Sequence, residues 1–514
     1  MSQYRADDDF APMTGAMLWT AGILLALANF MVVLDTTIAN VSVPNIAGGL
    51  AVSPSQGTWV ITSYSVAEAI TVPLSGWLAQ RFGAVRVFAV AMVSFGLCSA
   101  LCGLAPSLGV LVLFRVMQGL SGGPMIPLSQ TLLRRIFPMH LQPMAIGLWA
   151  MTTVVGPIAG PLLGGALVDT AGWPWVFYIN VPVALLCAFF VWRMLASRET
   201  RTERRPVDAV GLGLLVLWIG AMQIMLDKGK DLDWFQSPVI IGLAIIAALG
   251  FVSFIIWELT DDNPVVDLKV FRHRGFAAST IIMCVVYGTF FSSVVLIPLW
   301  LQTNMGYTAT WAGRATAFQG LLAVVMSPIV ARLTTRVDSR VLVSFGVLIM
   351  AGVSFWRTGF APNMNFWAVA MPQLAQGFAM PFFFVPLTGL ALGSVIPRET
   401  ASAAGLMNFS RTTAGAFAVS ITTTAWENTA SLHHSDLAGT LNNPGATIDK
   451  LTAIGMTSAQ AKGQIDSLVQ SQSVMLATDH IFLISSIMFV VGAAAVWLAP
   501  KPKSAVSSGG STAH

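Results

Sequence analysis

The chain has 514 residues, of which 55% are hydrophobic and only 10% are charged, whereas soluble domains carry about 25% charged residues. This composition predicts an all-α polytopic membrane protein and excludes a water-soluble domain. The formal net charge of +4 comes from basic residues spread over predicted loops, so no nucleic-acid-binding face is expected.

Apolar runs of about 20 residues predict membrane-spanning helices, and the sequence contains about fourteen of them. They lie near residues 17–40, 56–79, 85–105, 108–133, 143–168, 175–195, 209–226, 237–258, 276–302, 310–334, 341–358, 365–393, 400–426 and 477–499. When the N-terminus is placed in the cytoplasm, 19 of the 27 Lys and Arg residues fall in cytoplasmic segments and five in outer segments. This bias predicts an N-in and C-in orientation.

The chain repeats itself at an offset of about 250–260 residues: Gln118-Gly119 corresponds to Gln376-Gly377, and Gly147 corresponds to Gly405. Parallel six-span halves with a substrate site between them build one large class of transporters. We therefore expect two six-helix bundles and two inserted helices. The predicted segments are a cytoplasmic tail 1–16, a first bundle 17–196, a linker 197–208, two inserted helices 209–260, a linker 261–275, a second bundle 276–500 that includes an outer loop 427–476, and a tail 501–514.

Two carboxylates lie well inside predicted spans, Asp35 in the first and Glu68 in the second. An ionised Asp at the centre of a span costs about 2.5–3.5 kcal/mol on insertion scales. Such a group must be paired, hydrated or protonated, so we interpret both residues as candidate proton carriers. The alternatives are a helix–helix hydrogen bond for Asp35 and the polar wall of a cavity for Glu68.

The loop after the second span is short, basic and bounded by glycine, with Gly76, Arg81, Gly83 and Arg86. It resembles the cytoplasmic signature loop of the major facilitator superfamily, although Gln80 stands where that pattern usually has Asp. A plain tight turn is the alternative.

Arg115 lies inside the fourth span, where a guanidinium stays charged and needs an anionic partner or a water-filled cavity. With Gln118 and Gly119 it forms an Arg-x-x-Gln-Gly pattern that resembles the superfamily's pattern in this span. The resemblance implies that Arg115 acts on the carboxylate of Asp35 in proton coupling. A structural ion pair is the alternative.

The fifth span is rich in regularly spaced glycine and proline. Its motif residues are Gly147, Gly156, Pro157, Gly160, Pro161, Gly164 and Gly165. Glycines four residues apart fall on one helical face and let a neighbouring backbone approach closely, while the prolines remove helix hydrogen bonds. The pattern G-x8-G-P-x2-G-P-x2-G-G resembles the antiporter motif of drug-exporting members of the superfamily.

Further stretches indicate which branch of the superfamily the sequence resembles. They are 34–44, 172–182 and 408–411, together with the two inserted spans. They resemble the fourteen-span drug:proton antiporters, and within them the pumps of Gram-negative tripartite multidrug exporters. The resemblance implies export of small-molecule drugs across the bacterial inner membrane in exchange for protons, by alternating access. It also implies a periplasmic adaptor protein and an outer-membrane channel as partners.

A central cavity lined by apolar, aromatic and a few polar side chains is expected between the halves. Its candidate lining residues are Gln118, Met151, Gln376, Phe378, Phe382, Asn408 and Arg411. Arg411 and Arg314 are candidates for contacts with acidic substrates.

The outer segment 427–476 is the one sizeable polar stretch. Thr457 and Gln460 fit a capping box, and apolar residues then recur at helical spacing from Ala461 to Val469. We expect a short amphipathic helix there. It either contacts the adaptor protein or folds over the mouth of the pump itself.

No G-x-x-x-x-G-K-[ST] motif occurs, so the energy source is expected to be the proton gradient, with no cofactor. The four cysteines and the adjacent His433 and His434 lack the spacing of a metal site, and none is predicted. A dedicated exporter of one endogenous metabolite, siderophore-like or lipid-like, is the second hypothesis. A membrane enzyme is least favoured, because no cluster of His, Cys or Asp is present.

Overall fold

The computed structural model describes residues 13–203, 206–361, 364–440 and 444–499. Within these ranges all regular elements are helices and no strand is found. All of the expected spans are helical, and eleven stretches of the described chain are long and apolar enough to cross a membrane. The remaining expected spans correspond to α3 with α4, to α8 and to α17. The all-helical membrane class predicted from composition is therefore confirmed.

Between residues 13 and 203, the structure describes ten α-helices of the first half. They are α1 (Gly15–Gly49), α2 (Pro54–Gly57), α3 (Trp59–Thr71), α4 (Ser75–Phe82), α5 (Ala84–Gly103), α6 (Leu108–Gly122), α7 (Met125–Ile136), α8 (Gln142–Ala171), α9 (Trp175–Tyr178) and α10 (Asn180–Leu195). Two interruptions coincide with proline, Pro73 between α3 and α4 and Pro124 between α6 and α7. Proline lacks the N–H that a continuous helix needs.

The rest of the chain begins with the pair α11 (Ala209–Lys228) and α12 (Pro238–Thr260). It continues with α13 (Arg274–Thr303), α14 (Ala309–Leu333), α15 (Ser339–Arg357), α16 (Phe366–Gly393), α17 (Thr400–Thr440), α18 (Pro444–Ala453) and α19 (Ser458–Ala495). Short 3-10 helices are η1 (Met139–Leu141), η2 (Ala196–Arg198), η3 (Trp234–Gln236), η4 (Leu268–Arg272), η5 (Pro397–Glu399) and η6 (Val496–Leu498).

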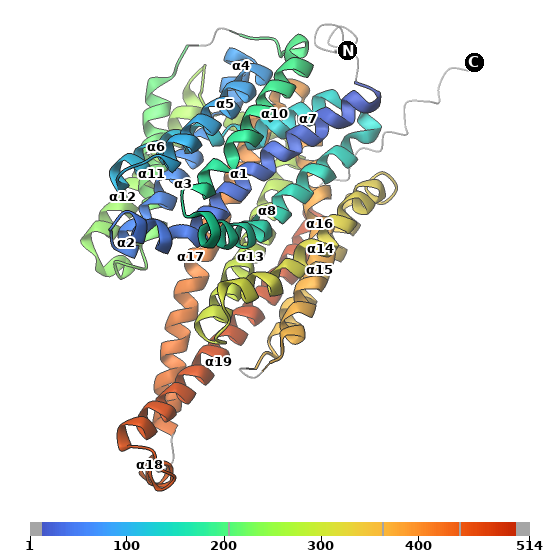
Figure 1. Ribbon diagram of the computed structural model, residues 1–514. Coiled ribbons are helices and arrows are strands. Elements are labelled where there is room, and N and C mark those ends of the chain that lie inside the picture. Colours follow the sequence, from blue (N-terminus) through green and yellow to red (C-terminus); the bar gives the residue numbers. More distant parts are fainter. Residues whose placement is uncertain (1–12, 204–205, 362–363, 441–443, 500–514) are drawn as a thin grey trace.

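The repeat seen in the sequence recurs in the packing. In the first half α1 packs on α8, α3 on α6 and α5 on α10, and in the second α13 packs on α17, α14 on α16 and α15 on α19. The halves meet through α8 against α14 and through α17 against α4 and α7 (Figure 1). The two contacts are reciprocal: Gly147 lies against Ser327 and Ala331 of α14, and its counterpart Gly405 lies against Val72 and Pro73.

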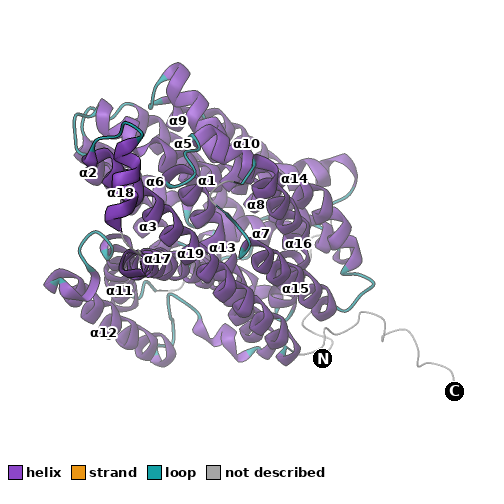
Figure 2. Ribbon diagram, turned by 90° about the horizontal axis from the view of Figure 1, so that it is seen from below, coloured by secondary structure: helices purple, strands orange, loops and turns teal. Residues whose placement is uncertain are grey.

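The inserted pair lies at the edge of the bundle. α11 and α12 pack on each other, and α11 also packs on α3 and α17 (Figure 2). Trp218 of α11 contacts Phe251 of α12 and Phe409 of α17 edge to face. The pair is thus joined to both halves through an apolar cluster around Trp218.

Helices α17 and α19 project together past the other helices and are joined by α18 (Figure 1). The amphipathic helix expected within 427–476 is not a separate element: α17 continues to Thr440, and α19 runs unbroken from Ser458 to Ala495. Neither helix contains a proline, and Ala461 and Val469 are buried where α19 packs along α17. The predicted capping box of Thr457 and Gln460 is confirmed at the start of α19.

Candidate functional site

Asp35 and Arg115 form a buried ion pair inside the first half. Arg115 Nη1 donates to Asp35 Oδ2 at 2.6 Å. The side chain of Arg115 is 0% exposed and that of Asp35 is 1% exposed. Pairing makes the burial of both charges tolerable, because either charge alone would remain uncompensated. The pairing that the motif resemblance implied is therefore present in the structure, while its part in proton coupling stays a prediction.

Three further polar side chains complete this site. Asp35 Oδ1 accepts hydrogen bonds from Asn180 Nδ2 at 2.6 Å and from Gln118 Nε2 at 3.1 Å. Asn180 also donates to Ser99 Oγ at 3.2 Å, and Gln118 Oε1 accepts from Arg115 Nη1 at 2.8 Å. We call Asp35, Ser99, Arg115, Gln118 and Asn180 the Asp35 cluster. It draws residues from α1, α5, α6 and α10 to one point.

The Arg115 guanidinium is also held by backbone and by aromatic rings. Its Nε donates to the Val60 carbonyl at 3.0 Å, and its centre lies 4.2 Å from the ring centroid of Tyr64 and 5.6 Å from that of Phe177. These cation–π contacts are strengthened by desolvation. Sequence reasoning missed Asn180, Ser99 and Tyr64. The available signal for Asn180 was an amide side chain in an otherwise apolar run.

Glu68 lies one turn beyond Tyr64 on α3 and is half-buried. Its carboxylate makes no hydrogen bond to any residue in the described part of the chain. It lies within electrostatic range of Asp35, Arg115 and Arg411. Glu68 is therefore near charged residues of both halves.

Arg411 of α17 occupies an aromatic cage where the halves meet. Its guanidinium centre lies 5.0 Å from the ring centroid of Tyr287, 5.2 Å from that of Phe384 and 5.8 Å from that of Trp149. Trp149 stacks on Phe384 at 6.0 Å, which joins α8 of the first half to α16 of the second. Among the described residues no partner for Arg411 Nε is found. The sequence did not single out the three aromatic residues.

The glycine face of α8 packs against the stretch of α1 that carries Asp35. The contacts are Val33 at Gly156, Thr37 at Gly160 and Ile38 at Gly164. Thr37 Oγ1 also donates to the Gly156 carbonyl at 3.2 Å. α8 runs without interruption through Pro157 and Pro161, and Gly165 faces away from close contacts. The close helix approach predicted for this motif is therefore confirmed.

Glu199 of the linker 197–208 binds the end of the loop between α4 and α5. Gly83 has φ of +95°, a conformation that glycine adopts readily. The Glu199 carboxylate accepts from the backbone N–H groups of Val85 and Arg86, at 2.9 Å each, at the start of α5. A carboxylate is favourable at a helix N-terminus. The linker 197–208 had been given no role, so this contact is a finding of the structure.

The other residues of this signature loop make local contacts. The Arg81 guanidinium centre lies 5.3 Å from the Trp77 ring centroid. Gly76 lies against Ser402 of α17, which places the loop at the contact between the halves. Arg86 is exposed and reaches the Glu199 carboxylate at 4.0 Å.

The residues predicted to line one central cavity are spread over three environments. Gln118 belongs to the Asp35 cluster, and Gln376 is bound by Arg357 within the second half. Phe378 and Phe382 contact each other, with ring centroids 5.3 Å apart, and Phe382 lies against α15.

Only part of that set is near the contact between the halves. Asn408 Nδ2 donates to Gln130 Oε1 of α7 at 2.6 Å, which joins the two halves, and Arg411 lies in its cage. Met151 is half-buried on α8. Arg314 is exposed, and its guanidinium centre lies 4.9 Å from the ring centroid of Trp311. The lining of a cargo cavity therefore stays a prediction.

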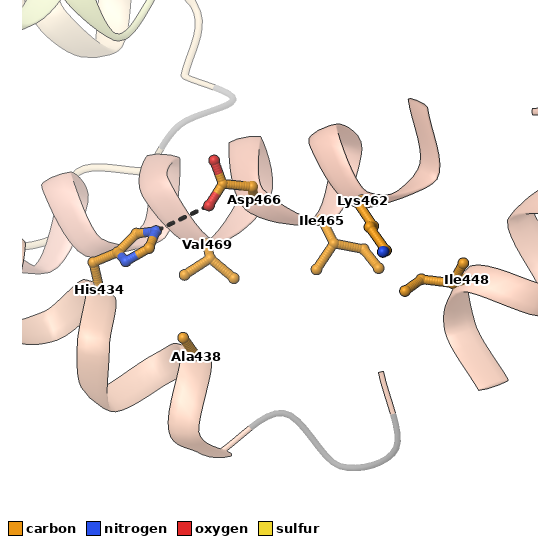
Figure 3. A pocket seen from close by; sticks show the side chains of 7 residues that line it. All are labelled: His434, Ala438, Ile448, Lys462, Ile465, Asp466 and Val469. Carbon is orange, nitrogen blue, oxygen red and sulfur yellow. Dashed lines mark hydrogen bonds and ion pairs between the residues drawn. The ribbon is translucent and has the colours of Figure 1, made fainter. Parts of the chain in front are cut away.

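The projecting helices enclose a small hollow of about 190 Å³ between α17, α18 and α19 (Figure 3). It is lined by His434, Ala438, Ile448, Lys462, Ile465, Asp466 and Val469. His434 Nε2 lies 3.2 Å from Asp466 Oδ1 across it. No group of three His, Cys, Asp or Glu side chains that could hold a metal is found among the described residues.

Comparison with known proteins gives the following matches. The Major Facilitator Superfamily profile matches residues 25–419. The chain is 46% identical to the multidrug export protein EmrB of Escherichia coli K12, over 98% of this chain and 99% of that protein. It is 44% identical to the fatty acid resistance protein FarB of Neisseria gonorrhoeae, over 96% and 98%. The fold is similar to the solved structure of the proton:xylose symporter XylE, with a TM-score of 0.58, 14% identity and coverage of 95% and 96%.

Proposed function

The chain belongs to the Major Facilitator Superfamily, and on that premise we propose that it is a proton-coupled multidrug exporter. The family predicted from the sequence motifs is thereby confirmed. The observation that carries the proposal is the Asp35 cluster beside the glycine face of α8. It places a buried carboxylate on the helix that the antiporter motif holds.

In the proposed cycle Asp35 is the proton carrier. Protonation removes the negative charge that Arg115 faces at 2.6 Å, so the ion pair that ties α1 to α6 is weakened. α1 is packed on Gly156 and Gly160, and movement of α1 is therefore transmitted to α8. Because α8 contacts α14, a change at Asp35 can bias the relative position of the two halves, as alternating access requires.

Glu68 and Arg411 connect this cycle to the cargo. Glu68 is half-buried and lies within electrostatic range of both the Asp35 cluster and Arg411. In the proposal it shares the proton with Asp35, and cargo competes with the proton for the region between the halves. A charge moving through 100 mV supplies about 2.3 kcal/mol, and no cofactor is involved.

The proposal includes the finer topology and the partners. The chain would span the bacterial inner membrane fourteen times with both termini inside, taking hydrophobic or amphipathic drugs from the cytoplasm or the inner leaflet. A periplasmic adaptor (EmrA-like) and an outer-membrane channel (TolC-like) would complete a tripartite system. The projecting pair α17 and α19 supports the adaptor contact, since it reaches beyond the other helices (Figure 1).

A dedicated exporter of one lipid-like metabolite is the second candidate. Two observations favour it: the relative FarB is named for fatty acid resistance, and Arg411 presents a buried cation inside an aromatic cage. Fold and coupling would be the same. A screen of chemically diverse cargo separates the two, because a dedicated exporter moves one class only.

The test uses purified protein in liposomes with an imposed proton gradient. We expect uptake of a fluorescent drug that is driven by the gradient and stops when both the pH difference and the voltage are collapsed. A second arm measures proton release on drug addition. Drug movement that continues unchanged without either gradient would exclude an antiporter.

A further inference from the structure

A further buried arginine, Arg357, lies in the second half, at the end of the span that the sequence predicts over 341–358. Arg357 is the last residue of α15 and is 0% exposed. Its Nη2 donates to Gln373 Oε1 at 3.1 Å and to Gln376 Oε1, both on α16. The two glutamines are 1% and 2% exposed. We call Arg357, Gln373 and Gln376 the Arg357 cluster.

The Arg357 cluster has more donors than acceptors. Arg357 Nε and Nη1 and Gln373 Nε2 are buried without a hydrogen-bond partner among the described residues. Among the same residues no ion pair of Arg357 with an Asp or Glu is found, and its guanidinium centre lies 5.5 Å from the centroid of the Phe482 ring. A buried charge normally has a partner of opposite charge, since desolvation without one is costly.

The internal repeat indicates which charged group of the Asp35 cluster has no counterpart in the second half. Ser99, Arg115 and Gln118 of the Asp35 cluster have Arg357, Gln373 and Gln376 as their counterparts 258 residues later. Gln118 with Gln376 and Gly147 with Gly405 keep the same spacing. By this spacing Asp35 corresponds to Ser293 on α13, which is 1% exposed. The second half therefore has a guanidinium at the sequence position of Ser99, glutamines at those of Arg115 and Gln118, and a neutral hydroxyl at the sequence position that matches Asp35.

We propose that the Arg357 cluster binds a small monovalent inorganic anion such as chloride, which supplies the negative charge that Asp35 supplies in the first half. The unpartnered N–H groups of Arg357 and Gln373 are the donors. One guanidinium matches one negative charge, and the burial of all three side chains excludes a bulky ligand. This site is independent of the proposed transport function, because it lies inside one half.

The experiment uses the full-length protein purified in detergent, with sodium chloride exchanged for sodium gluconate at constant ionic strength. Binding of radiolabelled chloride is measured by equilibrium dialysis, and Tm is measured across the same series. Ligand that binds only the folded state raises Tm in a saturable way. We expect one chloride per chain and a saturable rise of Tm in the wild type.

Two variants and one control locate the site. Arg357→Gln removes the charge and should lose both responses. Ser293→Asp restores a carboxylate at the position that matches Asp35, so it should fold with a Tm that no longer depends on chloride. The variant Arg336→Gln, at an exposed arginine of the same half, should respond as the wild type does. If Arg357→Gln fails to fold, the chloride dependence of Tm in Ser293→Asp tests the proposal instead.

Three outcomes would overturn the proposal. The first is a wild-type Tm and dialysis result that do not change between chloride and gluconate. The second is a chloride response that persists in Arg357→Gln or Ser293→Asp, which would place the anion elsewhere. The third is a response to dodecanoate without one to chloride, which would identify a cargo carboxylate instead of an inorganic ion.

Discussion

Substitution of Asp35 by Asn tests the ion pair at the centre of the first half. Asp35 accepts hydrogen bonds from Arg115, Gln118 and Asn180 at 2.6, 3.1 and 2.6 Å. An asparagine offers one oxygen acceptor and places an amide N–H₂ against the remaining donors. It also leaves the Arg115 guanidinium, which is 0% exposed, without its counter-charge.

The expected loss of stability follows from that geometry. Removal of one partner from a buried ion pair costs about 3–5 kcal/mol, because the remaining charge stays buried and unpaired. The double variant Asp35→Asn with Arg115→Gln removes both charges, so most of this loss should be regained. An exposed pair gives the matched control: Glu427→Gln breaks a contact of 2.6 Å to Lys230 and should cost at most about 1 kcal/mol.

Stability and coupling are measured on the same variants. Tm of the purified proteins reports the stability, and a pH-sensitive dye reports drug-dependent proton release in everted vesicles. Asp35→Asn should lose both, the double variant should regain Tm but not proton release, and Glu427→Gln should keep both. Wild-type proton release by Asp35→Asn would remove Asp35 from the coupling mechanism. A double variant less stable than Asp35→Asn would refute the argument from unpaired charge.

Three other substitutions test the surrounding structure. Gly160→Leu should destabilise the protein by about 1–3 kcal/mol through overpacking against Thr37, and it should abolish drug efflux in cells. The control Gly165→Ala adds a methyl group that meets no neighbouring atom within 4 Å, so Tm and efflux should not change. Equal effects of the two variants would refute the packing argument. Glu68→Gln should lower drug-dependent proton release at least about tenfold, as loss of general acid–base groups does. Tm should change little, because the Glu68 carboxylate has no hydrogen bond to the described residues. A large fall in Tm would indicate a structural role. Thr457→Ala should cost about 1 kcal/mol of local stability at the start of α19. This loss would be measured as faster amide hydrogen exchange over residues 458–465. Unchanged exchange would contradict the capping box.

The charged linker shows how tertiary structure gave a role to residues that had none from the sequence. Glu199 lies in a stretch of alternating charges that is typical of a solvated connector. In the structure its carboxylate binds two backbone N–H groups at the start of α5. The end of the signature loop therefore has a carboxylate that comes from another segment, and no local pattern could have indicated this.

The sequence by itself determined what depends on local patterns. Composition gave the all-helical membrane class, and glycine spacing gave the face of α8 that packs on α1. The charges of Asp35 and Arg115 in apolar runs each called for a partner, and the family resemblance implied that the two act together. Thr457 with Gln460 could be expected from the capping pattern. Each of these features depends on helical periodicity or on the cost of burying a charge, and both can be assessed from the chain alone.

Only the tertiary structure decided which distant spans meet and which side chains they bring together. It added Asn180 to the Asp35 cluster, enclosed Arg411 in aromatic rings and buried Arg357 beside two glutamines. It also joined 458–476 to the following span as one helix, α19. These outcomes depend on packing between helices far apart in the chain. An apolar helix presents several faces of similar hydropathy, and only the neighbours present in the folded bundle select among them.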